Sequence, residues 1–192
     1  MRREILQNKG FTIFGLLNII TILIIVIVLF IGIWGRFTQS NNLEGATKLI
    51  KMSVLKALNS SKELDDKYFG VFLEEKVGRE VKIYSREKVD KENYETKIFD
   101  EKDYKSLSLP AGTRINKIFI LNNTSNEKYA INEGGVSVVF SGSGKKIELI
   151  DKEGLINIEN EEVLVIEVSS FSVVQYVIID TNKSRIEIRD KE

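Results

Sequence analysis

Hydrophobic and polar positions divide the chain into three stretches with different periodicities. Residues 11–35 carry no charged side chain and are almost entirely apolar. From Leu43 to Leu58, apolar residues recur every three or four positions, which is typical of a helix with one buried face. From Tyr68 onward the period shortens to two, which is typical of strands. The pattern therefore predicts an α+β protein in which one long N-terminal helix precedes an antiparallel β-sheet domain.

The apolar stretch is long enough to cross a membrane. It runs for 25 residues between Lys9 and Arg36. At about 1.5 Å per residue, a helix of that length extends about 37 Å, which exceeds a hydrocarbon core of about 30 Å. Trp34 stands where an interfacial aromatic residue is expected.

The leader before this stretch sets the expected orientation. Its side chains carry a net charge of +2 from Arg2, Arg3, Lys9 and Glu4. Because positive loops stay in the cytoplasm, we expect a single-pass protein of the bacterial cytoplasmic membrane with its C-terminal domain outside the cytoplasm. The run is too long for the apolar region of a cleavable secretory signal and no small-residue cleavage site follows it. These features by themselves favour an uncleaved anchor.

The elements expected after the membrane span are a helix and eight strands. The helix continues to about Leu64, with Asn41-Asn42 or Gly45 as points where it could weaken. The strands are expected at Phe69–Glu74, Val81–Ser85, Ile115–Leu121, Gly135–Phe140, Lys145–Ile150, Val163–Val168, Val173–Asp180 and Arg185–Arg189.

Several connections and one central strand also follow from the pattern. Residues 173–180 are apolar on both faces, which predicts a central strand. Residues 141–144, with the sequence SGSG, predict a hairpin loop, and Thr181–Lys183 are expected to join the last two strands. Residues 86–109 are charged and poorly periodic, so we expect a surface insertion, with one short strand near Thr96–Phe99.

Composition excludes several classes of function. Lys plus Arg and Asp plus Glu both number 28, so no net field attracts nucleic acid, and no direct nucleic-acid partner is expected. The chain has no cysteine and no histidine. Disulfides, thiolate nucleophiles, Cys/His zinc sites and imidazole catalysis are therefore excluded.

The remaining motifs do not point to a catalytic or metal site. SGSGKK, at residues 141–146, lacks the first glycine and the final Ser or Thr of a phosphate-binding loop. The acidic clusters Asp65-Asp66 and Glu159–Glu162 do not have the spacing of a calcium-binding loop and are interpreted as solvated surface charge. We expect no enzymatic activity, no catalytic residue, no metal and no cofactor.

The residues at the start of the apolar stretch resemble a family signature. Lys9, Gly10, Phe11 and Thr12, followed by Leu16-Leu17, stand at the boundary between the charged leader and the span. This arrangement resembles the class III signal of type IV pilins and of the pseudopilins of type II secretion, which typically reads KGFTLIELL. The resemblance implies cleavage by a prepilin peptidase between Gly10 and Phe11, and N-methylation of Phe11. It also implies a pilin-like fold, with the second half of the helix packed on the β-domain.

Gly15 is the main departure from that signature. Most family members carry a glutamate there, and a carboxylate inside the bilayer is costly unless it meets a partner. The resemblance implies that this glutamate docks onto the N-terminal amine of a neighbouring subunit. In lacking this glutamate, the chain resembles a minor pseudopilin at the filament tip, although drift in a degenerate pilin-like protein explains the missing glutamate equally well.

Two further features bear on this resemblance. Asn18 lies three residues after Gly15, and Thr21 lies one turn further, so we expect small and polar residues suited to helix packing on one face of the helix. Isolated residues of these types are also tolerated in single spans. Residues 135–190, in which a strand ending in Phe140 is followed by a glycine turn and a closing hairpin, resemble the H-type minor pseudopilins and related minor pilins.

The sequence therefore predicts a structural subunit. Its expected parts are a leader (1–10), a transmembrane or filament-core helix (11–35), an amphipathic second half of the helix (36–66) and an extracytoplasmic β-domain (67–192). Its expected partners are the prepilin peptidase, other pilins or pseudopilins, the inner-membrane assembly platform and the membrane. The alternatives are an uncleaved, membrane-anchored extracytoplasmic binding domain and, less favoured by the residues, a membrane-tethered enzyme.

Overall fold

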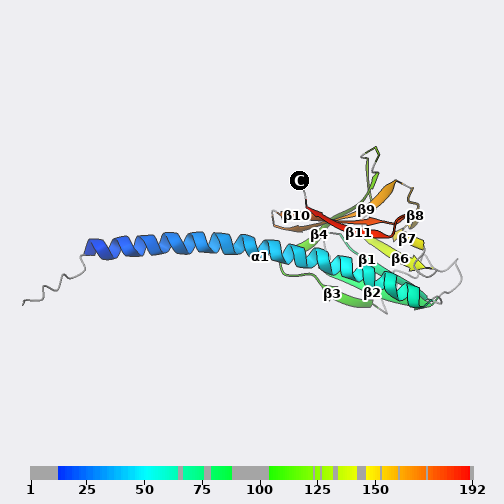
Figure 1. The fold of residues 1–192 in the computed structure, drawn as a ribbon, viewed down its shortest axis with the longest axis horizontal. Coiled ribbons are helices and arrows are strands. Elements are labelled where there is room, and N and C mark those ends of the chain that lie inside the picture. Colours follow the sequence, from blue (N-terminus) through cyan, green and yellow to red (C-terminus); the bar gives the residue numbers. More distant parts are fainter. Residues whose placement is uncertain are drawn as a thin grey trace, which may run out of the picture. The chain divides into compact units, whose positions relative to one another are not determined.

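The protein has one long helix and two antiparallel sheets (Figure 1). A computed structural model describes residues 13–64, 67–75, 79–87, 104–122, 124–125, 127–131, 134–141, 146–151, 153–159, 161–171 and 173–190. The helix, α1, spans Ile13–Glu63. The chain divides into two units, one ending at Thr38 and the other beginning at Gln39, so that each holds part of α1. The predicted α+β class is confirmed.

The strands form a six-stranded and a five-stranded sheet. The first has the order β3-β2-β1-β6-β7-β8 and the second the order β11-β10-β9-β4-β5. Every pairing between neighbouring strands is antiparallel. The bounds are β1 Lys67–Leu73, β2 Glu80–Glu87, β3 Tyr104–Ser108, β4 Thr113–Asn122, β5 Lys128–Ala130, β6 Val136–Ser141, β7 Lys146–Asp151, β8 Gly154–Ile156, β9 Glu162–Ser170, β10 Val173–Asp180 and β11 Arg185–Asp190.

All eight predicted strands are present; β10 has the predicted bounds, and no end of the other strands is shifted by more than two residues. The apolar strand predicted at residues 173–180 is β10, which lies between β9 and β11 as predicted for a central strand. The predicted pairing on either side of the SGSG segment is also confirmed, because β6 and β7 are antiparallel neighbours. Residues 142–145 themselves lie outside the described residues.

Three strands were not predicted, namely β3, β5 and β8. The prediction of a surface insertion at residues 86–109 is wrong at both ends, because β2 continues to Glu87, Tyr104–Ser108 form β3 and Leu109 is buried. Among the described strands, β3 pairs with β2 alone, and it has one apolar position on its inner face, Leu107, so it gives almost no alternating signal. β5 and β8 have three residues each, which is too short for a period to be recognised. The strand expected near Thr96–Phe99 lies outside the described residues.

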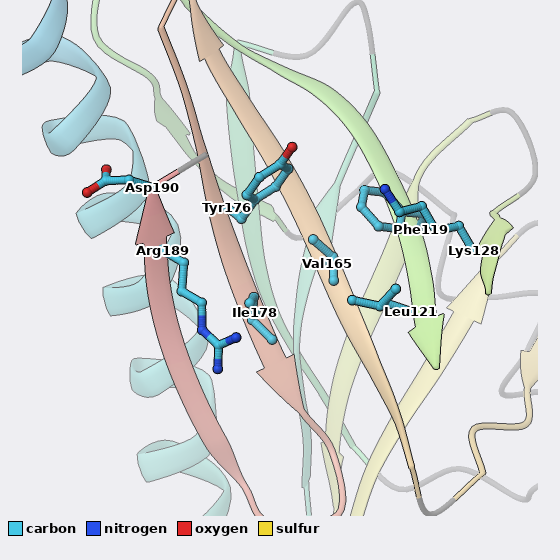
Figure 2. Close-up of a pocket in the computed structure, with 8 residues that line it drawn as sticks. All are labelled: Phe119, Leu121, Lys128, Val165, Tyr176, Ile178, Arg189 and Asp190. Carbon is cyan, nitrogen blue, oxygen red and sulfur yellow. The ribbon is translucent and has the colours of Figure 1, made fainter. Parts of the chain in front are cut away.

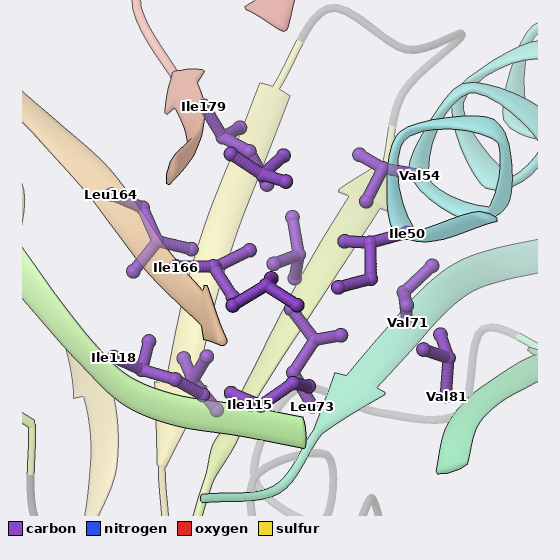
Figure 3. Close-up of a cluster of buried hydrophobic side chains, with 14 of the residues drawn as sticks. Ile50, Val54, Val71, Leu73, Val81, Ile115, Ile118, Leu164, Ile166 and Ile179 are labelled. Carbon is purple, nitrogen blue, oxygen red and sulfur yellow. The ribbon is translucent and has the colours of Figure 1, made fainter. Parts of the chain in front are cut away.

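One hydrophobic core joins the second half of α1 to both sheets (Figure 3). The buried apolar residues of the helix are those that the periodicity predicted: Leu43, Ala46, Ile50, Val54, Ala57 and Leu58. Figure 3 shows Ile50 and Val54 directed toward side chains of β1 and of the five-stranded sheet. Removal of these apolar side chains from water is the main contribution to the stability of the domain.

The helix does not break at its expected weak points. α1 continues through Asn42 and Gly45, and both residues contact the turn before β4. The Asn42 side chain donates a hydrogen bond to the carbonyl oxygen of Ala111 at 3.0 Å. A Cβ atom added to Gly45 would lie 3.4 Å from Cγ of Pro110. Tertiary contacts therefore support the segment that helix propensity alone leaves weak.

Candidate assembly surface

The first unit of the described chain presents an apolar surface on every side of α1. Each large apolar side chain between Ile13 and Phe37 is 47–83% exposed. A helix that is apolar all round is stable only when lipid or other helices cover it. By its length and composition, α1 can span a membrane, which is compatible with a single-pass membrane protein.

Most residues of the family signature lie beyond the described part of α1. Lys9, Gly10, Phe11 and Thr12 fall outside the described residues, so the expected cleavage and methylation site is not placed. The other positions of interest all lie on the first turns of α1: Gly15, Leu16, Leu17, Asn18 and Thr21.

Gly15, Asn18 and Thr21 form a slanted row along α1. Gly15 is partly buried within the structure, and the other two are exposed. Three residues of an α-helix turn about 300°, which is about 60° less than a full rotation. Two such steps separate Gly15 from Thr21, so these residues lie about 120° apart around the helix, on different sides. The Thr21 hydroxyl donates to the carbonyl oxygen of Leu17 at 2.9 Å. Its proton is therefore satisfied within the helix, as is common for threonine in apolar helices.

Aromatic residues mark the end of the apolar surface. The rings of Phe30 and Trp34 stack with their centroids 5.8 Å apart, and the Thr38 hydroxyl donates to the carbonyl oxygen of Trp34 at 2.9 Å. Arg36 is the first charged residue after the span. This combination of a stacked tryptophan and a following arginine is typical of a membrane–water interface.

A second surface, which the sequence did not reveal, is a shallow groove of about 730 Å³ on the outer face of the five-stranded sheet (Figure 2). Its floor is a row of paired residues, Phe119 on β4, Val165 on β9 and Ile178 on β10. Lys128 and Arg189 lie on opposite sides of these residues in Figure 2. The ammonium of Lys128 lies 5.4 Å from the centroid of the Phe119 ring, within range of a cation–π interaction.

The groove combines apolar side chains with ionisable ones. Its remaining lining residues are Leu121, Tyr176 and Asp190. The sequence signal for this groove is the apolar character of both faces of residues 173–180, which also predicts a central strand.

Tyr176 provides a probe of this surface. Burial raises the pKa of its phenol above the ordinary value of 10.0, and the nearby charge and hydrogen bond of Glu167 raise it further. We expect Glu167→Gln to lower the pKa of Tyr176 while leaving it above 10.0, because the larger cause remains. A pH titration of ¹³C-labelled tyrosine by NMR measures this shift, with Tyr176→Phe assigning the resonance. Glu153→Gln, in the turn between β7 and β8 of the other sheet, is the matched control and is expected to leave the pKa of Tyr176 unchanged.

The acidic residues near the start of β9 make local contacts. The carboxylate of Glu162 accepts a hydrogen bond from the backbone N–H of Glu159 at 3.0 Å, and Glu161 accepts one from the Thr124 hydroxyl. Within the described ranges, no group of three or more acidic residues is placed to hold a metal ion. Asp65 and Asp66 lie outside those ranges.

Comparisons with known proteins do not add a family assignment. No protein-family model matches the chain, and no curated protein and no solved structure matches it significantly. The arguments for function therefore come from the chain itself.

Proposed function

We propose that the protein is a structural subunit of the type IV pilin or pseudopilin class, matured by a prepilin peptidase and assembled through α1. The observation that carries the proposal is that two parts of one uninterrupted helix differ in which side chains they bury. Between Ile13 and Phe37 its apolar side chains are exposed, whereas between Leu43 and Leu58 it buries one face in the domain. A helix of this kind can hold a folded domain and still offer an apolar surface to other helices.

The residues before the helix support the same proposal. KGFT, at residues 9–12, stands where charge gives way to apolar residues, so cleavage after Gly10 would place a new N-terminus at the start of the apolar surface. Subunits would then associate by packing apolar helices, first in the bilayer and later in a filament. Such a filament would serve type II secretion, pilus function or DNA uptake in competence, and the β-domain would face other subunits or cargo.

Gly15 bears on where in a filament the subunit would stand. A subunit without the buried carboxylate cannot neutralise the N-terminal amine of a neighbour in the bilayer. A subunit at the tip needs no such contact, whereas a subunit in the shaft would depend on van der Waals packing alone. Both positions are compatible with the proposed assembly.

An uncleaved, membrane-anchored binding domain is the second candidate. The length of the apolar run and the absence of a small-residue cleavage site after it favour this alternative. In that case the leader remains on the protein, and the groove on the outer face of the five-stranded sheet offers a surface to a ligand.

The N-terminal mass separates the two candidates. For protein purified from its native membrane, we expect the first peptide to begin at Phe11 and to carry one methyl group on its α-amine. Mass spectrometry of that peptide measures both changes. Substituting Gly10 by valine is expected to abolish cleavage, because the new side chain occupies the residue whose carbonyl is attacked.

The control is a substitution outside the cleavage site. Gln7→Ala, in the same leader, is expected to be processed normally. An intact wild-type chain that still begins before Gly10, in cells with an active prepilin peptidase, would contradict the proposal and leave the anchored binding domain. If cleavage is found, Gly15→Glu tests filament position, since a shaft subunit should gain incorporation into filaments.

A further inference from the structure

The turn between β9 and β10 exposes a phenylalanine. Ser170 on β9 pairs with Val173 on β10, and Phe171 directly follows Ser170 in the connection between these strands. Phe171 is 78% exposed and has a backbone φ of 51°. In two-residue hairpin turns, positions with positive φ are usually glycine, asparagine or aspartate, because a bulky side chain is strained there.

This turn departs from the usual rules in a second way. The side-chain oxygen of Ser170 is buried and, among the described residues, has no hydrogen-bond partner. Neither departure is compensated by burial of the Phe171 ring, which stays in contact with solvent. Strained backbone and unsatisfied polar groups concentrate where a protein uses the residue for function. Phe171 is therefore placed for contact with something outside the domain.

The turn is attached to the beginning of the domain's helical segment. The ring of Phe171 lies over Gly112, where an added Cβ would be 3.1 Å from its Cε2 atom. The neighbouring carbonyl of Ala111 accepts the hydrogen bond from Asn42 at 3.0 Å, and Pro110 packs near Gly45. Phe171 is thus linked, through one short turn, to the first residues of α1 in the second unit.

The chain between this attachment and the membrane span is short. Arg36 ends the charge-free run, and Asn42 follows six residues later. Six residues extend about 9 Å as a helix and at most about 22 Å when fully stretched. Headgroups at the outer surface of a membrane spanned by α1 are therefore within reach of this end of the domain.

The exposed residues at this end fit a lipid surface. Val173 is 39% exposed beside Phe171, and Ala111 and Gly112 present no charge. Arg114 is exposed at the start of β4 and can approach lipid phosphates. An aromatic residue with aliphatic and basic neighbours is the combination found at the boundary between headgroups and acyl chains.

We propose that the β9–β10 turn docks onto the lipid surface of the membrane that α1 spans, with Phe171 inserted at the level of the headgroups. The proposal requires that α1 be anchored in a membrane, but it does not require cleavage after Gly10. Because the domain is tethered, the contact is intramolecular, with an effective concentration on the order of millimolar. One aromatic residue is then sufficient to restrain the domain of an unassembled subunit against the bilayer.

The absence of cysteine allows a direct test, because single spin labels can be placed without background. The full chain is reconstituted in phosphatidylethanolamine–phosphatidylglycerol vesicles with a label at Phe171→Cys. A label in lipid collides often with oxygen and rarely with a water-soluble nickel chelate. We expect a several-fold loss of nickel collisions relative to Leu155→Cys, which lies on β8 and is 43% exposed. A label at Ile25→Cys reports separately whether α1 is in the bilayer.

Each outcome has a defined meaning. Lipid-like accessibility at both 25 and 171 supports the proposal. If position 25 is in lipid while 171 is as accessible to nickel as 155, the docking proposal is overturned and the membrane anchor stands. If all three positions are aqueous, both fail. Shielding at 171 that disappears when the protein is diluted in lipid indicates a protein neighbour, which also overturns docking.

A second variant separates docking from folding. Phe171→Asn removes the ring and places a residue that tolerates positive φ, so the unfolding midpoint is expected to stay the same or to rise. With the label at Val173→Cys, nickel collisions are expected to be low in the otherwise unchanged chain and to increase in Phe171→Asn. A label at Val173 that remains shielded in Phe171→Asn would show that Phe171 is not the anchoring residue.

Discussion

Gly135→Ala is expected to lower the free energy of unfolding of the domain by at least about 3 kcal/mol, through overpacking and backbone strain together. Gly135 has a φ of 105°, which side-chain-bearing residues rarely adopt. An added Cβ would lie 2.3 Å from the carbonyl oxygen of Leu73 and 2.9 Å from Cα of Glu74. Both atoms belong to the backbone at the end of β1, so no side chain can rotate away.

The position explains why the contact cannot relax. Leu73 pairs with Val136, and Gly135 is therefore the residue where β6 comes alongside β1. Pushing the two apart would break the pairing in the middle of the six-stranded sheet, because β1 and β6 are its central strands. Urea unfolding of the full chain in detergent, followed by circular dichroism, measures the loss.

Gly45→Ala is the matched control for this prediction. Gly45 is helical, and its added Cβ would make an ordinary contact at 3.4 Å with Pro110. Alanine is favoured over glycine inside a helix by roughly 1 kcal/mol, so this variant should be as stable as the original or more stable. Equal stability of Gly135→Ala and the original chain would show that β1 and β6 do not approach each other as described.

Ile50→Ala is expected to cost about 3 kcal/mol of unfolding free energy, within the range for buried isoleucine truncated to alanine. Ile50 is 0% exposed and lies where α1 meets both sheets (Figure 3). Removing its outer carbons leaves a cavity that neighbouring strands, held by their ladders, cannot fill. The same denaturation experiment in detergent measures the change.

Met52→Ala, two residues further along α1, is the control. Met52 is 69% exposed, so its truncation should change stability by no more than about 0.5 kcal/mol. Similar losses for the two variants would contradict the assignment of one buried face to this part of the helix. If Ile50→Ala lowers the unfolding free energy only slightly, the helix does not pack on the sheets.

The features that the sequence predicted correctly depend on local periodicity. The membrane-length run is defined by the absence of charge, and the buried face of α1 follows from a spacing of three to four residues. β10 and β11 were recognised because their apolar residues alternate or run continuously over six residues or more. The KGFT signature is equally local, and the cleavage that it implies remains a prediction.

The features that the sequence did not reveal depend on contacts between distant residues. Strand β3 is stabilised by pairing with β2, and its own five residues carry little alternation. The groove on the five-stranded sheet arises only when Phe119, Val165 and Ile178 come into register across three strands. Likewise, nothing in the residues around Phe171 shows that its turn lies over Gly112.

The helix, its membrane-length apolar half, its buried face and most strands can thus be predicted from the residues alone, because each follows from the spacing of neighbouring side chains along the chain. The division of the strands into two sheets, the central pairing of β1 with β6 and the position of Phe171 near the start of the domain's helical segment are visible only in the folded chain. These arrangements are selected by packing and hydrogen bonding between segments far apart in sequence, and periodicity carries no information about which segments meet.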